Sequence, residues 1–271
     1  MSTKTNTTNK GGAKKVQRPS DEFVQSFARG LAVIRTFNAQ TPQQTLTQVA
    51  KAAGLTRAGA RRILLTLVHL GYVEVEERLF RLTPRILDLG FAYLTSMPFW
   101  NLAEPVMEEL VEKVSESSSV GVLDGDEVVY VLRVPAKKIM TVSLSIGSRL
   151  PALWTSMGRV LLSGLADDEV MDIIRATDCL QGPTPAALST PEDLLAEIRR
   201  VREQGWAIIN QELERGLISM AAPILDRQGR IIAAINLSCN AQRSSAGQVQ
   251  EDFLELLLDA ARRITYMLLR H

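Results

Sequence analysis

The sequence predicts a mixed α+β protein with two unlike parts, and three observations support this. Apolar residues at helical spacing fill short segments before residue 70, whereas alternating apolar runs typical of strands recur later in the chain. Charge also divides along the chain: residues 1–83 hold 13 Lys and Arg against five Asp and Glu, a net charge of +8. The remainder holds 18 against 25, a net charge of −7. This asymmetry predicts that only the first part meets a polyanion.

The composition limits the class of protein. The chain has 271 residues, enough for two domains, and its 46% hydrophobic and 23% charged residues are typical of globular proteins. No apolar run reaches the roughly 18 residues that a membrane span needs, and the N-terminus lacks the apolar core of a secretory signal. Cys179 and Cys239 match neither a disulfide framework nor a metal-site spacing. We therefore expect a cytoplasmic protein with reduced thiols, no metal, no cofactor and no membrane partner.

The first part begins with a polar stretch and three predicted helices. Residues 1–20 lack apolar periodicity, which predicts a disordered basic tail. Its five positive charges have two open interpretations: contact with DNA phosphates, or solvation without a specific role. Ser26 is the expected N-cap of the first helix, and Gly54 and Gly71 are the expected ends of the second and third. The predicted inward-facing residues are Leu31, Ile34 and Phe37, then Leu46, Val49 and Ala50, then Ala60, Ile63, Leu64 and Leu67.

A small hairpin follows the third helix. Residues 72–82, YVEVEERLFRL, contain two apolar runs on either side of a charged tip at residues 76–78. Three helices, a tight glycine-containing turn and a hairpin predict a winged helix-turn-helix DNA-binding domain over residues 21–83. The third helix is then the recognition helix, whose N-terminal residues point at base edges in the major groove.

The recognition helix has features that suit DNA. Arginine can bond guanine bidentately or anchor on a phosphate, and Ala58 and Gly59 keep the helix slim where it approaches the DNA backbone. The alternative is an amphipathic surface helix with solvated arginines. The flanking helix, the hairpin and the charge of +8 favour the DNA interpretation. The predicted DNA-binding residues are Thr56, Arg57, Ala58, Gly59, Arg61, Arg62 and Arg78.

The remaining chain predicts a linker helix over residues 84–99, stopped by Pro98, and an α+β domain over residues 100–271. Asp124 and Gly125 between alternating apolar runs predict a hairpin turn rather than a catalytic site. Thr190, Pro191 and Gly205 begin and end one well-marked helix. The predicted helices are 101–116, 167–177, 190–205 and a long amphipathic helix that closes the chain. The predicted strands are 119–123, 127–134, 139–146, 206–213, 219–226 and 230–239.

No catalytic set is evident. The two histidines, His69 and His271, have no indicated nucleophile partner, and the sequence holds no HExxH, GxSxG, P-loop or GxGxxG motif. We therefore expect a protein that is not an enzyme, and an enzyme with an attached DNA-binding module is the less supported alternative.

The region SIGSRLPALWTSMGRVLL indicates a ligand site. A glycine-containing loop leads to Trp154 and to Thr155 and Ser156 at a helix start, where backbone N–H groups and hydroxyls suit a carboxylate. The alternative is an ordinary N-cap beside a packed tryptophan. Arg133 lies in an otherwise apolar strand, either as an edge charge or as an inward ligand for a carboxylate.

These segments together resemble the IclR family of bacterial transcriptional regulators from about residue 22 onward. The resemblance rests on SFARGLAVIRTF, LTRAGARRILLTLVHLGY, RLPALWTSMGRVLL and GWAIINQELERGLISMAAPILDRQGRIIAAINLS. Gly205, Glu212, Ser219, Ala221, Pro223 and Gly229 match the C-terminal signature. The chain departs from the family at Ile209, where many members have an acid, and at Leu225, where an aromatic residue is common. Within the family, ARGLAVI, AYLTSMP, RLPALWTSMGR and NQELE resemble regulators of protocatechuate and 4-hydroxybenzoate catabolism in the β-ketoadipate pathway.

The resemblance implies a transcriptional regulator with a GAF-like effector-binding domain. It implies a homodimer or a dimer of dimers on a palindromic double-stranded operator, with RNA polymerase as a further candidate partner. The implied effector is a small aromatic or dicarboxylic acid such as protocatechuate, 4-hydroxybenzoate or β-ketoadipate. Thr155, Ser156, Ser219, Asn236 and Ser238 match the family's pocket positions, and the neighbouring Trp154 and Met157 complete the predicted set with Arg133, which is inferred from its chemistry.

Several questions stay open from the sequence. Regulation can be activation or repression, and the effector can be a different small organic acid. An architectural DNA-binding oligomer whose second domain binds no ligand is a further alternative.

Overall fold

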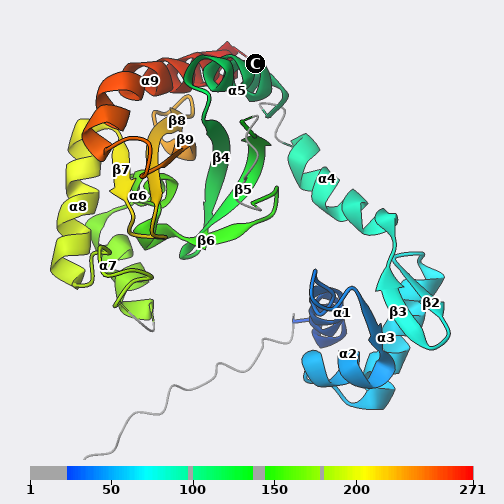
Figure 1. The fold of residues 1–271 in the computed structure, drawn as a ribbon. Helices are drawn as coiled ribbons and strands as arrows, with labels where there is room; N and C mark the ends of the chain where they lie inside the picture. The colour runs from blue at the N-terminus through cyan, green and yellow to red at the C-terminus, as the bar shows by residue number, and fades with distance from the viewer. Residues whose placement is uncertain (1–22, 97–99, 137–143, 178–179, 271) are drawn as a thin grey trace, which may run out of the picture. The chain divides into compact units, whose positions relative to one another are not determined.

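The computed structural model describes residues 23–96, 100–136, 144–177 and 180–270 (Figure 1). The predicted basic tail, Pro98, Cys179 and His271 lie outside these residues. The chain forms two compact units, with the division between Ala92 and Tyr93, and each has its own hydrophobic core. Within the described residues, no helix is both long enough and apolar enough to cross a bilayer.

Unit 1 contains three helices and a three-stranded antiparallel sheet of order β1-β3-β2. The core of this unit includes Val33, Phe37, Leu64 and Phe80. The bounds are α1 Gln25–Arg35, β1 Gln43–Thr45, α2 Leu46–Ala52, α3 Arg57–His69, β2 Val73–Glu76 and β3 Leu79–Leu82. The helices, their order and the hairpin confirm the predicted winged helix-turn-helix.

Local residue chemistry explains where these elements begin and end. The hydroxyl of Thr45 accepts from the backbone N–H of Gln48, whose side chain accepts in return, so α2 begins with a capping box. Thr56 caps α3 by accepting from the Gly59 N–H at 3.1 Å. Glu77 and Arg78 both have positive φ values, 49° and 77°, as a tight two-residue hairpin turn requires.

Three details of unit 1 differ from the sequence predictions. Ser26 is not a cap: it lies inside α1, which begins one residue earlier with Val24 as N-cap and no side-chain cap. Leu31 is 39% exposed, and the buried residue of α1 is Val33 instead, whereas Phe37 is buried as predicted, just after the helix ends. Strand β1 was not predicted, because Gln43–Thr45 has none of the apolar alternation of a strand.

A short 3₁₀ helix, η1 (Pro84–Ile86), leads into α4 (Leu87–Ser96). The guanidinium of Arg85 lies 5.5 Å from the centre of the Tyr72 ring, so a cation–π contact ties η1 to the start of the hairpin. The helical character predicted for this segment is confirmed over these residues.

Unit 2 is a six-stranded antiparallel sheet with helices on both faces. The strand order is β6-β5-β4-β9-β8-β7. The strands are β4 Ser117–Asp124, β5 Glu127–Val134, β6 Arg149–Pro151, β7 Ala207–Asn210, β8 Leu217–Leu225 and β9 Ile231–Asn240. The helices are α5 Trp100–Val114, α6 Ser156–Leu162, α7 Asp167–Ala176, α8 Pro191–Gln204 and α9 Ala246–Arg270, with the 3₁₀ helix η2 at Ala152–Trp154. This arrangement confirms the predicted α+β class.

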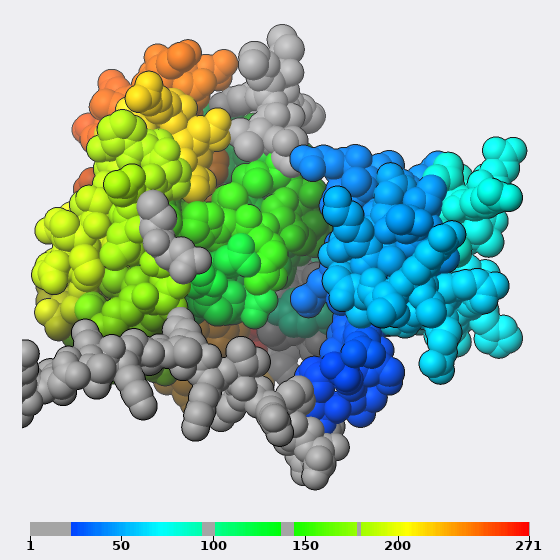
Figure 2. All heavy atoms as spheres, turned by 90° about the horizontal axis from the view of Figure 1, so that it is seen from below, coloured from blue at the N-terminus to red at the C-terminus, as the bar shows by residue number. Residues whose placement is uncertain are grey.

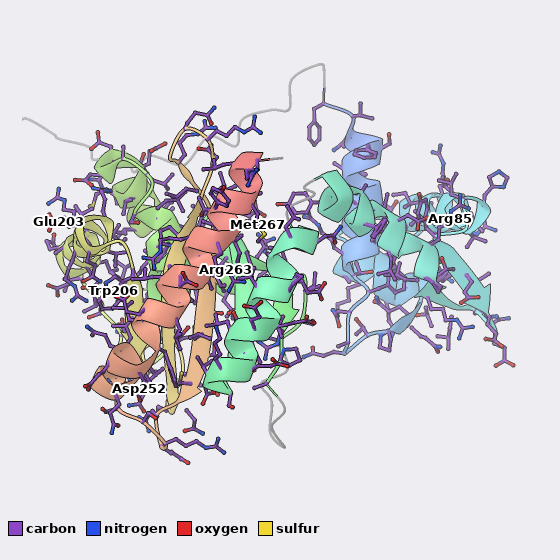
Figure 3. The ribbon with its side chains drawn as sticks, turned by 90° about the horizontal axis from the view of Figure 1, so that it is seen from above. Arg85, Glu203, Trp206, Asp252, Arg263 and Met267 are labelled. Carbon is purple, nitrogen blue, oxygen red and sulfur yellow. The ribbon has the colours of Figure 1, made fainter. Side chains whose placement is uncertain are left out.

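The two faces of the sheet bury different cores. Helices α5 and α9 lie side by side on one face (Figure 3), where Arg263 on α9 donates to Glu109 on α5 at 2.7 Å. Helix α6 packs on the other face against β8 and β9, and α8 packs on α6. The α9-side core includes Val120, Leu132, Met220, Leu237 and Leu257. The α6-side core includes Val128, Tyr130, Met157, Ile198 and Ala221.

The expected strand at 139–146 needs correction. Residues 139–143 lie outside the described residues, and 144–146 are not a strand. The edge strand is instead β6, which pairs with β5. A turn precedes it, in which the Ser148 N–H donates to the Ser145 carbonyl at 3.0 Å and Gly147 has a φ of 87°. The serines and glycine of this segment therefore form a turn, although their apolar neighbours alternate as in a strand.

The pairing of β4 with β5 contains a β-bulge. Val120 pairs with Leu132, but the next residue of β4, Gly121, pairs with Tyr130. Val131 is thus the additional residue on β5. Side chains normally alternate between the two faces along a strand. One extra residue shifts this alternation by one, so the residues directly before and after it point to opposite faces.

Candidate DNA-binding and effector-binding sites

The N-terminal half of α3 presents unpaired cations. Arg57, Arg61 and Arg62 are exposed, and none forms a salt bridge with another described residue. They lie off the buried face formed by Ala60, Leu64 and Leu67. Unpaired guanidinium groups on a rigid helix retain all their donors for phosphate oxygens or base edges.

The hairpin distributes its charges differently. Arg81 is neutralised by Glu74, at 2.7 Å between Nε and Oε1, and lies 3.7 Å from Glu76. Arg78 at the tip is exposed and forms no salt bridge with another described residue. The cation at the end of the wing is therefore available, whereas the one within the strand is paired.

Gly59 has a local role in addition to the predicted one. A Cβ built at this position would lie 3.1 Å from the hydroxyl oxygen of Thr56, the same oxygen that caps the helix. A side chain here would crowd the cap slightly as well as filling space in front of the helix. The neighbouring Ala58 is exposed.

The predicted effector residues of α6 lie where this helix meets the sheet. Thr155 caps α6 by accepting from the Gly158 N–H at 3.1 Å, and Ser156 is the first helical residue. Gly158 permits a close approach, because a Cβ there would lie 2.1 Å from the carbonyl oxygen of Ala152. Gly121 on β4 does the same from the sheet, since a Cβ there would lie 3.2 Å from the sulfur of Met157. Small residues thus bring the helix start onto the strands.

A buried polar network joins four of the predicted residues. The hydroxyls of Ser156 and Ser219 are 2.7 Å apart. The amide of Asn236 donates to Ser219 at 3.1 Å and to Ser238 at 3.2 Å, and its oxygen accepts from the backbone N–H of Ser119 at 3.0 Å. The network therefore connects α6, β8, β9 and β4 on the α6 side of the sheet.

Arg133 lies beside this network. It is half-buried on β5, and its Nη1 donates to the hydroxyl of Ser119 at 3.3 Å. Ser119 pairs with Arg133 on one side and with Asn236 on the other, so their side chains share the α6 face. No carboxylate among the described residues pairs with Arg133. A half-buried guanidinium with most of its donors unused suits an anionic ligand.

Trp154 and Met157 have packing contacts in the structure. The indole N–H of Trp154 donates to the Leu188 carbonyl at 2.9 Å, and its ring packs against Gly182. Met157 is 1% exposed and lies in the α6-side core near Gly121. Both residues therefore belong to the apolar α6-side core.

The sequence reasoning missed the partner of Glu212. Arg159 of α6 is 1% exposed and donates to both carboxylate oxygens of Glu212, at 3.0 and 2.6 Å. The backbone N–H of Leu188 also donates to Glu212 at 3.1 Å. Glu212 was part of the recognised signature, but the two charged residues are 53 positions apart, so only the fold reveals the pair. Ser119 was missed too, because a serine in an apolar strand carries little signal.

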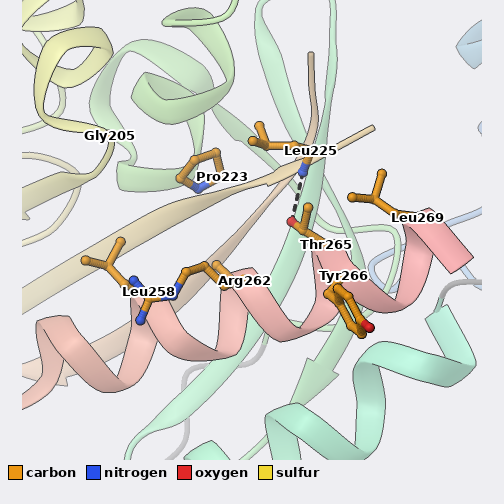
Figure 4. A pocket seen from close by; sticks show the side chains of 9 residues that line it. Gly205, Pro223, Leu225, Leu258, Arg262, Thr265, Tyr266 and Leu269 are labelled. Carbon is orange, nitrogen blue, oxygen red and sulfur yellow. Dashed lines mark hydrogen bonds between the residues drawn. The ribbon is translucent and has the colours of Figure 1, made fainter. Parts of the chain in front are cut away.

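A separate groove lies on the α9 side of unit 2 (Figure 4). Its volume is about 420 Å³, and Pro223, Leu225, Leu258, Tyr266 and Leu269 are among its lining residues. Thr265 fixes its floor by accepting from the Leu225 N–H at 3.1 Å. None of the predicted effector residues lines it. Among the described residues, no group of three or more His, Cys, Asp and Glu side chains could hold a metal ion.

Comparisons with known proteins agree over almost the whole chain. The family model described as bacterial transcriptional regulator IclR C-terminal matches residues 91–266, and the IclR helix-turn-helix domain matches residues 26–77. The Pca regulon regulatory protein of Pseudomonas putida is 38% identical, with 94% of this chain and 89% of that protein covered. The p-hydroxybenzoate hydroxylase transcriptional activator of Acinetobacter baylyi is 33% identical, with 90% and 92% covered.

Solved structures show the same fold. A Rhodococcus sp. RHA1 protein, solved as a candidate transcriptional regulator, is 49% identical with a TM-score of 0.81, covering 91% of this chain and 98% of that one. An IclR homolog from Microbacterium hydrocarbonoxydans, crystallised with 4-hydroxybenzoate, is 24% identical with a TM-score of 0.78, covering 90% and 98%.

Proposed function

The chain belongs to the IclR family of bacterial transcriptional regulators, and from this premise we propose that it controls genes of aromatic-acid catabolism in response to a small carboxylate effector. The family and the relatives are DNA-binding regulators, not enzymes. The relatives that carry the pathway assignment are named for the Pca regulon and for p-hydroxybenzoate hydroxylase. Protocatechuate, 4-hydroxybenzoate and β-ketoadipate are therefore the first effectors to test.

The DNA-binding surface in this proposal is the exposed side of α3 together with the hairpin tip. Thr56, Arg57, Ala58, Gly59, Arg61, Arg62 and Arg78 form it, and two copies of the chain would place two such surfaces on a palindromic operator. The supporting observation is that its arginines are exposed and unpaired among the described residues, unlike Arg81.

Replacing Arg61 tests this surface. Arg61→Ala should abolish specific operator binding in a gel-shift assay and leave effector binding intact, because the removed guanidinium lies on unit 1. Arg35→Ala removes an equally exposed arginine from α1 and should retain operator binding. Unchanged operator affinity in Arg61→Ala would remove α3 from its assigned role.

The effector site in this proposal is the α6 face of the sheet, where Arg133 holds the carboxylate and the serine–asparagine network contacts the remaining polar groups. The observation that carries it is a half-buried guanidinium without an acid partner among the described residues, beside four linked hydroxyl and amide groups. Trp154, Thr155 and Met157 supply the adjoining wall and the cap that positions Ser156.

Arg133→Met tests the carboxylate partner. Loss of a charged hydrogen bond costs about 1.5–3 kcal/mol, so effector affinity measured by calorimetry should fall at least about tenfold. Arg149→Met is the matched control, since Arg149 on β6 is already paired with Glu127 and Asp124, both at 2.6 Å. Near-normal affinity in Arg133→Met would exclude this residue from the site.

An exposed apolar surface supports the proposed self-association of the chain. Phe23, Val24, Phe27 and Leu31 of the α1 region are 50%, 63%, 67% and 39% exposed. Figure 2 shows the start of α1, in dark blue, at the surface of unit 1. Such a patch on a helix marks an interaction site. We propose that it joins two copies as a homodimer, which a dimer of dimers would extend. Effector binding would shift the population of dimer geometries, and so alter operator spacing or contact with RNA polymerase.

Two other classes of function predict different results. An enzyme with a DNA-binding module would convert a candidate acid, whereas a sensor returns it unchanged. An architectural DNA binder would show no thermal shift with any small acid. A thermal-shift panel of the three acids, followed by recovery of the ligand, separates all three.

A further inference from the structure

Tyr130 on β5 has a buried hydroxyl that no other described residue bonds. Its side chain is 4% exposed and packs in the α6-side core. Among the described residues, no group forms a hydrogen bond with its hydroxyl. Buried polar groups are normally bonded, and an exception calls for an explanation such as a ligand or water that completes the site.

The β-bulge brings this hydroxyl to the face that carries Arg133. Tyr130 and Arg133 are three positions apart, and on a regular strand residues at this spacing point to opposite faces. Here Val131 is the additional residue, so Tyr130 belongs to the α6-side core while Leu132 belongs to the α9-side core. Arg133, next to Leu132, returns to the α6 side, where it contacts Ser119. Bulges commonly redirect side chains beside functional sites in this way.

The two groups also influence each other electrostatically. Burial raises the pKa of Tyr130 to about 12, and the positive charge of Arg133 acts in the opposite direction. The hydroxyl is therefore protonated at neutral pH and is available as a hydrogen-bond donor near the guanidinium. Arg133 itself uses one of its N–H groups on Ser119, and no other described residue accepts from its remaining side-chain donors.

We propose that Tyr130 and Arg133 together form a carboxylate clamp, in which Tyr130 donates a hydrogen bond to the effector carboxylate that Arg133 holds. A carboxylate has two oxygens and about four acceptor positions, enough for a guanidinium and a phenol at once. The inference rests on the proposed function and adds Tyr130 as a specificity-determining residue. It predicts a site that prefers an anionic carboxylate to a neutral group of the same shape.

Calorimetry with matched ligands tests the clamp. 4-Hydroxybenzoate and 4-hydroxybenzamide differ only in the charged group, and protocatechuate with its carboxamide forms a second pair. Tyr130→Phe should weaken binding of the acid about tenfold, the loss of one hydrogen bond to a charged group, and leave binding of the amide almost unchanged. Tyr266→Phe, which removes a hydroxyl from an exposed tyrosine of the same unit, should bind both ligands as the unaltered protein does.

Folding provides an independent readout. Removing a hydroxyl that bonds no other described residue leaves none of them unsatisfied, so Tyr130→Phe without ligand should melt at the same temperature as the unaltered protein or higher. A hydroxyl that stabilised the fold would instead lower the melting temperature when removed. Such a result would overturn the proposal.

The outcomes separate the clamp from the proposed function. Normal acid binding by Tyr130→Phe, with binding lost in Arg133→Met, would overturn the role of Tyr130 and leave the carboxylate site in place. Equal weakening of acid and amide would show that the ring packs without reading the charge, and would also overturn it. If the unaltered protein bound none of the three candidate acids, the proposed aromatic-acid function would fail, and the clamp with it.

Discussion

Asn236 is the residue at which the polar network converges. It is 2% exposed, and its amide makes three hydrogen bonds, one accepted from β4 and two donated to Ser219 and Ser238. The orientation of the amide follows from these partners, because only the oxygen can accept from the Ser119 N–H. Asn236 therefore fixes the positions of two hydroxyls while it also ties β9 to β4.

At the same scale, substitutions of Gly59 distinguish an effect on DNA contact from an effect on folding. Gly59→Leu should fold but bind operator DNA poorly, because a large side chain would stand between the start of α3 and the DNA backbone. Gly59→Ala is the control for crowding of the Thr56 oxygen, and its effect on the melting temperature should be small. Normal operator binding by Gly59→Leu in a gel-shift assay would show that the DNA does not come close at this point.

Tyr130 predicts a specific alkaline instability. Burial raises the pKa of Tyr130 to about 12 in the folded protein, against 10.0 in the unfolded chain, because a phenolate is poorly solvated in the core. Ionisation therefore favours the unfolded chain as the pH rises from 10 to 12, and two pKa units correspond to about 2–3 kcal/mol of stability that is present below pH 10 and lost by pH 12. Between pH 9 and 11.5, the free energy of unfolding in urea should fall less steeply in Tyr130→Phe. Parallel slopes for the two proteins would contradict the raised pKa.

Helix α6 is held firmly in position against the sheet. All seven of its residues are buried, and three features hold it: the Thr155 cap, the close approach at Gly158, and the ion pair of Arg159 with Glu212. The cap and the glycine position the N-terminal Ser156, whereas the ion pair anchors the middle of the helix. The effector network therefore begins on a rigid support.

The ion pair of Arg159 with Glu212 predicts that substitutions of two nearby acids have unequal effects on stability. Glu212→Gln should lower the free energy of unfolding by about 3 kcal/mol, since it leaves a buried guanidinium without its compensating charge. Glu197→Gln removes a carboxylate 3.8 Å from the same arginine, but Glu197 is more exposed and also bonds Arg200, so its effect should be below about 1 kcal/mol. Urea unfolding would measure both, and equal effects would contradict the dominance of Glu212.

Elements with their own start and end signals were predictable from the sequence, and those set by distant partners were not. Thr56 and Thr190 cap helices where expected, and Gly205 ends α8 with a φ of 81°. Strand β1 forms only because β3 offers an edge to pair with, and β6 forms only against β5. The bulge at Val131 is equally invisible in a run of apolar residues. For the site, residue types indicated Arg133 and the serines, but only the packed core shows that the Tyr130 hydroxyl bonds no other described residue.

At the scale of the whole molecule, the exposed apolar residues of α1 predict the assembly state. Phe27→Glu should turn the proposed dimer into a monomer in analytical ultracentrifugation, because burying a carboxylate in an apolar interface is unfavourable. Operator affinity should fall with it, since one DNA-binding unit loses the benefit of the second. Leu165→Glu places the same charge on a partly exposed leucine of unit 2 and should leave the assembly unchanged. A dimer in Phe27→Glu would assign the interface elsewhere.

Because of the β-bulge at Val131, the faces that Tyr130 and Arg133 occupy depend on how many residues lie between them in β5. Deleting this one residue would remove the bulge and leave Tyr130 and Arg133 two positions apart on the same face, whereas deleting both residues between them would make them adjacent and turn one of them to the opposite face. A two-residue deletion between Tyr130 and Arg133 would therefore abolish carboxylate recognition without changing the identity of any recognising residue. Divergence of ligand preference among related chains can in this way arise from strand length as readily as from substitution.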